Sequence, residues 1–536
     1  MLPGAAATPR RPRQARRRPL NSSNMFATLA SFARLLRALL TLVRHDAILP
    51  VEYQALYPAP ARLAGRLARL FARRDAADNP GERLARALET LGPSYVKFGQ
   101  ILATRGDVIG ERFARGLSRL QDRMPAFDDA EARAIIAAEL GAPVETLFKT
   151  FGPPIAAASI AQVHRATTQD DVEVAVKVLR PDIELRIARD IRTLSLGAAL
   201  AERLAPASRR LEPRKFVATI ARSLSFETDL RLEAAAASEL SEAAMAVEHY
   251  RIPEVEWTLS SKRILTTHWV PGVPLSDPEQ VEGLGLDKAA LATTLTRAFL
   301  GTALDRGVFH ADMHAGNLFA SANCDLWAVD FGIMGRIGRP ERRFLALILH
   351  GFLTRDYMAA ARAHFAAGYV PDEHAVADFA SALRAVGEPI FGKRADEVPM
   401  SRVLMQLFEI TDLFDMRLRP ELVMLQKTMV QCEGVARGLD PQHNMWTAAT
   451  PVVEAWMKRE LGPEGRIRDI GEDLERLHGA LRALPDTIEH WNEIGARLKS
   501  GELALCTAPP PRPWAVRLAW LAAAALAGAA AMWAIL

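Results

Sequence analysis

Carboxylate and amide side chains suited to metal-assisted phosphoryl transfer are concentrated in one short part of the sequence. The run HADMHAGN begins at His310 and contains Asp312 and Asn317, and the triplet DFG begins at Asp330. Phosphoryl transfer needs a carboxylate near the nucleophile and oxygen ligands for the Mg²⁺ ion that bridges the nucleotide phosphates. We therefore expect Asp312 to act as the base or positioning residue, and Asn317 and Asp330 to bind the metal.

The order and separation of these motifs match the catalytic loop H-x-D-x-x-x-x-N and the D-F-G triplet of protein kinases. DFG alone is a weak match, but the two motifs in this order around a short hairpin, Leu318–Val329, are specific. Upstream, the run VAVK ends at Lys177 and matches the V-A-I-K strand whose lysine holds nucleotide phosphates. Glu233, in a later helical stretch, is the candidate partner of Lys177, and the alternative is an ordinary surface glutamate.

The segment before Lys177 departs from the kinase pattern. Kinases carry a loop G-x-G-x-x-G-x-V, in which glycine permits positive φ and a close approach of the backbone to the nucleotide. Alanine occupies all three glycine positions here, so we expect nucleotide binding to differ from that of an ordinary kinase. The expected nucleotide-binding loop consists of Ala156, Ala157, Ala158, Ser159, Ile160, Ala161, Gln162 and Val163.

The elements that must position these motifs follow an α+β order. Three runs of β-branched and apolar residues predict strands. They lie at Val172–Leu179, Arg263–His268 and Leu326–Val329. Helical periodicity dominates residues 55–150 and 340–500. The segment Asp287–Arg306 predicts a helix leading into the HADMHAGN loop, with Asp287 as its N-cap and Gly307 just past its end. This order of helices, a small sheet and a second helical region argues against an alternating βαβ fold.

Together these features resemble the UbiB family of atypical kinase-like proteins. Besides the alanine-rich loop, the run KFGQ beginning at Lys97 matches the family's KxGQ motif, and the run ETD beginning at Glu227 matches its ExD motif. The resemblance implies a two-lobed, protein-kinase-like fold whose N-terminal extension covers the active site, with Lys97 near the nucleotide. It also implies that Lys97, Gly99, Gln100, Glu227 and Asp229 help to occlude the usual peptide-substrate site.

The resemblance further implies that ATP and Mg²⁺ are the cofactors of an ATPase or unorthodox kinase activity, with Asp312, Lys177 and Glu233 as catalytic residues. It implies a role in ubiquinone (coenzyme Q) biosynthesis, acting on or extracting polyprenyl-phenol lipids. The alternatives are a pseudokinase scaffold of the quinone biosynthetic complex and a small-molecule phosphotransferase. A hydroxylase is not supported, because the sequence has no strand followed by G-x-G-x-x-G, no suitably spaced two-His-one-carboxylate set and no haem-binding cysteine motif. The short run Ile333–Arg339 after DFG agrees with a non-peptide substrate.

Both ends of the chain bear on a membrane setting. Residues 518–536 carry no charge and follow Arg512 and Arg517, which predicts a transmembrane helix with the catalytic domain on the cytoplasmic side. The segment Met25–Val43 is interrupted by arginines and predicts an amphipathic helix that lies either on a membrane or on the folded domain. We expect the bacterial inner membrane, with the mitochondrial inner membrane as the alternative.

Charge and cysteine content exclude two other classes. The net charge is +4, but six arginines lie within residues 1–18, so the rest of the chain is slightly negative and a nucleic-acid-binding surface is not expected. The three cysteines are widely separated, which supports neither a zinc site nor a disulfide framework.

The expected partners are a lipid bilayer, polyprenyl-phenol quinone intermediates, other ubiquinone biosynthesis proteins and a second copy of this chain.

The predicted domains follow from these boundaries. Residues 1–24 form a disordered basic tail, for which a transit peptide and a start at Met25 are the alternatives. The remaining predicted segments are a helical N-terminal extension at 25–150, a kinase-like domain at 151–500 with an N-lobe at about 151–272 and a C-lobe at about 273–500, a Pro-rich linker at 501–517 and the transmembrane helix at 518–536.

Overall fold

The computed structural model describes residues 22–47, 79–103, 111–117, 125–204, 212–390, 409–416 except 412, and 420–462, together with residues 72, 120 and 406. The chain divides into two compact units, residues 1–457 and 458–536, and nearly all described residues belong to the first. The predicted tail up to residue 21, the linker and the transmembrane helix lie outside the described residues. Among the helices that are described, none combines the length and the apolar character needed to cross a bilayer.

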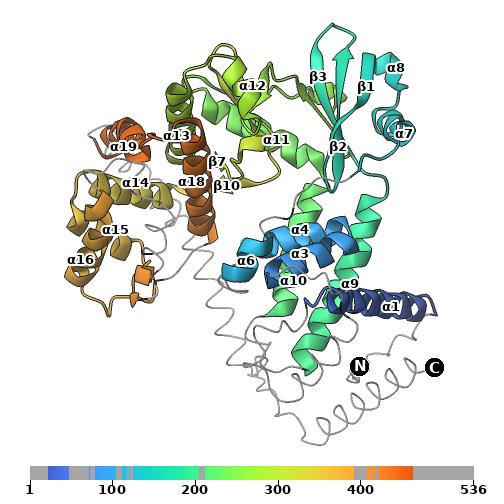
Figure 1. The fold of residues 1–536 in the computed structure, drawn as a ribbon, viewed down its shortest axis with the longest axis horizontal. Helices are drawn as coiled ribbons and strands as arrows, with labels where there is room; N and C mark the ends of the chain where they lie inside the picture. Colours follow the sequence, from blue (N-terminus) through green and yellow to red (C-terminus); the bar gives the residue numbers. More distant parts are fainter. Residues whose placement is uncertain are drawn as a thin grey trace, which may run out of the picture. The chain divides into compact units, whose positions relative to one another are not determined.

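Helices of the N-terminal extension pack together with two long helices that follow later in the chain (Figure 1). They are α1 (Ser22–Arg44), α3 (Pro80–Leu91), α4 (Pro93–Ala103), α6 (Glu111–Leu117), α9 (Ile183–Leu204) and α10 (Pro213–Glu227). Asn79 caps α3 by accepting a hydrogen bond from the Gly81 amide, and Pro80 fits the first helical turn. Leu88, Val96 and Leu117 form a small core between α3, α4 and α6. The helix predicted at Met25–Val43 is confirmed as α1.

A four-stranded antiparallel sheet follows the extension. Its strands are β1 (Phe148–Ala157), β2 (Ala161–Thr168), β3 (Glu173–Leu179) and β5 (Ile264–His268), in the order β1-β2-β3-β5. Helices α7 (Asp129–Leu140) and α8 (Val144–Leu147) belong to the core on one face of this sheet. The strands predicted near β3 and β5 are confirmed.

Sequence patterns did not indicate strand β1, for a physical reason. The strand contains Pro153 and Pro154, which cannot donate to a β ladder and therefore weaken the strand signal. It lies at the edge of the sheet, and its register with β2 is interrupted at several points. An edge position tolerates proline, so tertiary pairing overrides the local preference.

The motif-bearing segment builds two small sheets around helices α11 (Leu230–Ala244), α12 (Pro278–Gly283) and α13 (Lys288–Asp305). One sheet has the order β4-β9-β8-β6 and the other pairs β10 with β7. The bounds are β4 (Tyr250–Arg251), η3 (Trp257–Leu259), β6 (Gly272–Pro274), β7 (Val308–His310), η4 (Ala315–Asn317), β8 (Leu318–Ser321), β9 (Leu326–Ala328) and β10 (Met334–Arg336). The predicted helix Asp287–Arg306 is confirmed, since the Asp287 carboxylate caps α13 and Gly307 follows it with φ +74°.

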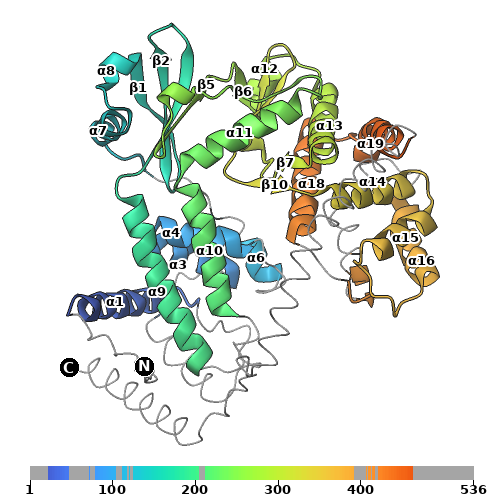
Figure 2. The same ribbon diagram turned by 180° about the vertical axis from the view of Figure 1, so that it is seen from behind.

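Further helices complete the first unit. They are α14 (Arg339–Leu353), α15 (Tyr357–Ala366), α16 (Val376–Gly387), η5 (Glu388–Ile390), α18 (Pro420–Leu439) and α19 (Met445–Leu461). Tyr357, Phe379 and Phe414 form a core of their own around α15 and α16. In contrast, α18 packs directly on α13, which brings it next to the HADMHAGN loop (Figure 2).

Candidate active site

Strand alternation determines where the Lys177 side chain points. Val174, Val176 and Val178 are fully buried in the core that includes α7. Because successive side chains of a strand point to opposite faces, Lys177 lies on the other face of β3. Neighbouring strands pair with Lys177 on both sides, at Val163 of β2 and at Leu265 of β5. The central strand therefore holds this lysine at a fixed place.

Two carboxylates from distant parts of the sequence face the Lys177 ammonium. Its Nζ atom lies 2.7 Å from Oε1 of Glu233 and 3.0 Å from Oδ1 of Asp330. Burial disfavours the charged lysine, but the charges on Asp330 and Glu233 outweigh this effect and raise the pKa of Lys177. Burial raises the pKa of Glu233, and the lysine charge opposes that rise. The structure thus brings Lys177, Glu233 and Asp330 into one cluster.

Asp330 has an unusual backbone conformation. Its φ is +65°, a region that residues other than glycine adopt rarely and that is often found at functional sites. The Lys177 ammonium lowers the pKa of this carboxyl well below its usual range, and the charge on Lys97 adds to the effect. Just over half of the side-chain surface remains accessible, which leaves the carboxylate able to bind a cation. The next residue, Phe331, is buried with its ring 5.7 Å from that of His310.

The HADMHAGN loop is held together by its own hydrogen bonds. The Asp312 amide donates to Nδ1 of His310, so the ring proton lies on Nε2 and is donated to the carbonyl of Val329. Burial lowers the pKa of His310, which favours this neutral form. Asn317 donates from its side chain to the backbone carbonyl of Asp312 at 3.1 Å, leaving its own carbonyl oxygen as an acceptor. The geometry presents Asp312, Asn317 and Asp330 from one short segment.

Helix α18 contributes contacts that the sequence analysis missed. Gln431 donates from Nε2 to Oδ1 of Asp312 at 3.2 Å, and the Thr428 hydroxyl lies 3.3 Å from the carbonyl of Ala311. Both residues are more than 110 positions away from the loop, and no motif marks them. Only the packing of α18 on α13 reveals that Gln431 orients the carboxylate of Asp312.

The KxGQ and ExD motifs meet at an ion pair. Lys97 lies 3.3 Å from Oε2 of Glu227, with both side chains almost buried. Gly99 is required by close packing, because a Cβ atom there would lie 2.4 Å from the side chain of Leu120. Gln100 donates to the Leu120 carbonyl at 3.3 Å. After Lys177, the charge of Lys97 also contributes to lowering the pKa of Asp330.

Asp229, the last residue of the ExD motif, has a local structural role. Its carboxylate accepts from the Arg231 amide and caps α11, the helix that carries Glu233. It also forms two short hydrogen bonds with the Arg231 guanidinium. These contacts fix the start of α11. The occluding role that the resemblance implies for Asp229 stays a prediction.

The alanine-rich segment, expected as a loop at residues 156–163, spans the end of β1, a turn at residues 158–160 and the start of β2. Alanines 156, 158 and 161 do not adopt positive φ, so the backbone needs no glycine there. Ser159 and Gln162 are fully buried, and Gln162 accepts from the Phe127 amide. Arg180, which the sequence analysis did not single out, donates from its guanidinium to the Ala158 carbonyl. The turn is thus fixed by protein contacts, and Gln162 is engaged in them.

The donor set agrees with a metal that is shared with a nucleotide. In the described part of the chain, no group of three or more His, Cys, Asp or Glu side chains is arranged to hold a metal ion. Mg²⁺ commonly takes one or two protein oxygens and completes its shell with phosphate and water. Asp330, beside the Lys177 ammonium, and Asn317, on the HADMHAGN loop, carry oxygens of this kind.

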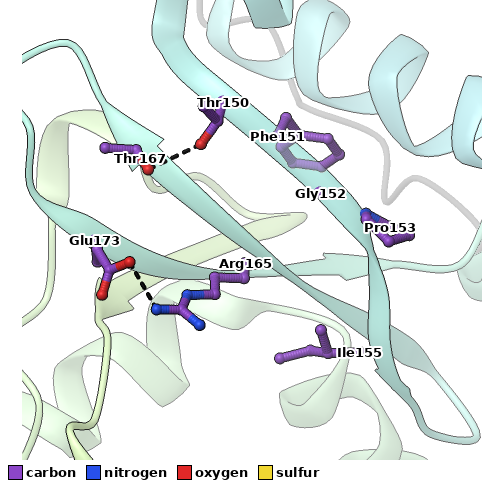
Figure 3. Close-up of a pocket in the computed structure, with 8 residues that line it drawn as sticks. All are labelled: Thr150, Phe151, Gly152, Pro153, Ile155, Arg165, Thr167 and Glu173. Atoms are coloured by element: carbon purple, nitrogen blue, oxygen red, sulfur yellow. Dashed lines mark hydrogen bonds and ion pairs between the residues drawn. The ribbon is translucent and has the colours of Figure 1, made fainter.

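The cavity shown in Figure 3 lies elsewhere. It has a volume of about 380 Å³ and is lined by residues of β1 and β2 and by Glu173 of β3. Arg165 crosses it to Glu173 at 2.6 Å. None of the residues expected to bind nucleotide or metal lines it, and neither do Lys177, Glu233 and Asp330.

Comparisons with known proteins establish the class. The ABC1 atypical kinase-like domain matches residues 119–364, and the UbiB helical domain matches residues 383–444. The first match contains Lys177, Glu233, Asp312 and Asp330, and the second contains Gln431. The chain therefore has a kinase-like fold of mixed helices and strands.

Bacterial relatives named "Probable protein kinase UbiB" are similar over most of the chain. That of Marinobacter nauticus is 40% identical over 399 residues, covering 74% of this chain and 73% of the relative. That of Xanthomonas euvesicatoria pv. vesicatoria is 38% identical over 448 residues, with 81% and 80% covered. That of Pseudomonas aeruginosa is 36% identical over 504 residues, with 92% of both chains covered. The chain belongs to the UbiB family, as its motifs predicted.

Removing the Lys177 charge is expected to destabilise the fold. Lys177→Met leaves Glu233 buried without its partner, and such a loss lowers the free energy of unfolding by about 3 kcal/mol. The double variant Lys177→Met/Glu233→Met removes both charges and is expected to recover part of the loss. Urea unfolding of the purified protein measures both values. Lys149→Met, which breaks an exposed pair with Asp171, is the control and should change little. Equal stability of Lys177→Met and wild type would contradict the structural role of this pair.

Proposed function

We propose that this protein binds Mg-ATP at the cluster around Lys177 and transfers or hydrolyses the terminal phosphate. The observation that carries the proposal is the pair of contacts from Lys177 to Glu233 and Asp330. A lysine on a central strand, fixed by a helix glutamate and placed beside a metal-binding aspartate, is the arrangement that phosphoryl transfer in kinases needs.

Each residue has a role that follows from its surroundings. Lys177 contacts the nucleotide phosphates, and Glu233 holds the lysine in place. Asp330 and Asn317 bind Mg²⁺, which supplies positive charge to the phosphates. Asp312 accepts a proton from the attacking hydroxyl or water, and the Gln431 amide keeps one of its carboxylate oxygens oriented.

The acceptor is proposed to be a non-peptide molecule. Between the DFG triplet and α14 the chain forms only the short strand β10, which pairs with β7. So short a segment offers little surface for an extended peptide. The nearly buried pair between Lys97 and Glu227 ties the extension to the end of α10, close enough for the Lys97 charge to act on Asp330. These features support an active site that the extension covers.

Family membership supports a role in ubiquinone biosynthesis, at a membrane and on polyprenyl-phenol intermediates. In this proposal ATP turnover drives handling of the lipid intermediate, either by phosphorylation or by extraction from the bilayer. The presence of the lysine, aspartate and asparagine side chains together favours this activity over a scaffold, which would need none of them.

The metal-binding aspartate provides the direct test of catalysis. Asp330→Asn keeps the shape of the side chain but removes its charge, so Mg²⁺-dependent release of phosphate from ATP is expected to fall at least about 100-fold. Asp171→Asn, at the exposed turn between β2 and β3, makes the same chemical change and is expected to leave the rate unaltered. Equal rates for Asp330→Asn and wild type would overturn the proposed site.

Gln431 tests the contribution of α18. Gln431→Leu removes the hydrogen bond to Asp312 while keeping similar volume, so kcat is expected to fall about tenfold with KM for ATP nearly unchanged. Gln426→Leu makes the same change on the same helix. Steady-state kinetics of the two variants separate positioning from folding, because a general defect would affect both. An unchanged kcat in Gln431→Leu would show that this contact is unnecessary.

The biosynthetic role is tested in a bacterium whose own UbiB gene has been deleted and replaced by the gene for this protein. Wild type is expected to restore ubiquinone, whereas Lys177→Ala expressed at the same level is expected to leave polyprenyl-phenol intermediates accumulated. Quinone extraction and mass spectrometry measure both. Full rescue by Lys177→Ala and by Asp312→Asn would indicate a scaffold, and an unchanged quinone profile in the deletion strain would place the activity outside quinone metabolism.

A further inference from the structure

Helix α1 is held to the protein by one face only. Ser31 and Ala38 are buried, and Leu35 packs against α9, where a Cβ on Gly197 would lie 3.3 Å from it. After the helix ends, the Arg83 guanidinium of α3 donates to the Asp46 carbonyl. Figures 1 and 2 show α1 crossing the part of α9 that is farther from the β1-β2-β3-β5 sheet.

A second face of α1, next to the inner one, exposes large apolar side chains. Phe32, Leu36, Leu39 and Leu40 are each between 43% and 53% exposed. At 100° per residue these four positions fall within an arc of about 100°, so they form one continuous stripe. A single exposed leucine needs no explanation, but four neighbours on one helix face indicate an interaction surface. We call this set the α1 apolar stripe.

Positive charge borders the stripe. Arg37 and Arg44 are exposed and lie along one edge of it. No aspartate or glutamate occurs in α1, and the sequence before it contains six arginines and no acid. A second copy of this chain would bring the same positive border with it, whereas anionic lipid headgroups would neutralise the arginines. An apolar stripe with a basic edge is the composition of helices that lie in a bilayer interface.

We propose that α1 docks on an anionic bilayer surface. The α1 apolar stripe enters the boundary between headgroups and acyl chains, and Arg37 and Arg44 contact lipid phosphates. The helix lies parallel to the surface and does not span the membrane, because its inner face is engaged with α9. The helical extension thereby becomes a membrane-facing surface in its own right, independent of the anchor predicted at residues 518–536.

Docking of α1 rests on the membrane setting of the proposed function, and it can be tested separately from ATP turnover. A negative result for α1 leaves ATP turnover at Lys177 untouched, and an inactive site leaves the docking of α1 untouched. Binding to vesicles is an insufficient measurement, since a C-terminal anchor would tether the chain by itself. The test must report the surroundings of α1 directly.

The experiment places a bimane label on the stripe of the full-length protein reconstituted in vesicles. Leu36→Cys is made in a Cys324→Ser/Cys506→Ser background, and Cys432 is retained because it is fully buried. Leu40→Cys is a second reporter position in case the first variant folds poorly. Met245→Cys, at the exposed residue that directly follows α11, is the matched site outside α1, and Met245 is 79% exposed. Vesicles contain phosphatidylcholine with or without phosphatidylglycerol, and with or without lipids brominated in the acyl chain.

The proposal predicts loss of bimane fluorescence at positions 36 and 40 with brominated lipid and protection from aqueous iodide, both only when phosphatidylglycerol is present. Label at position 245 should show the reverse. Adding Arg37→Gln/Arg44→Gln should reduce the quenching by brominated lipid. Free access of iodide to positions 36 and 40 would overturn the proposal. Protection from both quenchers would also overturn it, because protein would then cover the stripe, and equal quenching without phosphatidylglycerol would contradict the anionic surface.

Discussion

The ammonium group of Lys177 is the interaction on which the described site depends. A buried charge is unfavourable unless opposite charges face it, and here Glu233 and Asp330 do so at 2.7 and 3.0 Å. The three residues come from a central strand, from the first turn of α11 and from the loop after β9. One contact set therefore fixes three elements relative to one another and places an accessible carboxylate next to a fixed positive charge. Apolar residues of similar volume could fill the same space without lowering the free energy of unfolding. The charged cluster is therefore needed for the proposed activity more than for the stability of the fold.

Successive layers of contacts support this cluster. Asp229 caps α11 and so fixes the helix turn that carries Glu233. Neutral His310 holds the chain before Asp330 through the Val329 carbonyl, which helps a non-glycine residue to remain at positive φ. Helix α18 contacts the HADMHAGN loop through the hydrogen bond from Gln431 to Asp312. The extension adds the charge of Lys97. Residues from the extension, from the ABC1 atypical kinase-like domain and from the UbiB helical domain therefore act on the same few side chains.

The sequence could predict much of the site because phosphoryl transfer restricts residue type and spacing. Asp312, Asn317 and Asp330 are close in sequence, and Lys177 lies on a strand with clear β-branched alternation, so local patterns were enough. Glu233 was a candidate only from its place on a helical stretch after the Lys177 strand, since a pair separated by 56 residues leaves no periodic signal. Gln431 and Arg180 were missed because a glutamine on a helix and an arginine after a strand have no distinctive pattern until packing places them. Strand β1 was missed because its prolines are tolerated only at a sheet edge, which is a tertiary property.

Direct binding of nucleotide is the most decisive measurement, because every proposed role assumes that Lys177 contacts phosphate. Calorimetric titration of the full-length protein with Mg²⁺ and a non-hydrolysable ATP analogue isolates binding from turnover. We expect saturable binding to wild type that requires Mg²⁺, and binding at least about tenfold weaker to Lys177→Ala, in line with the loss of a charge-assisted hydrogen bond. Equal affinity in the two proteins, or no binding to a folded wild type, would contradict this expectation.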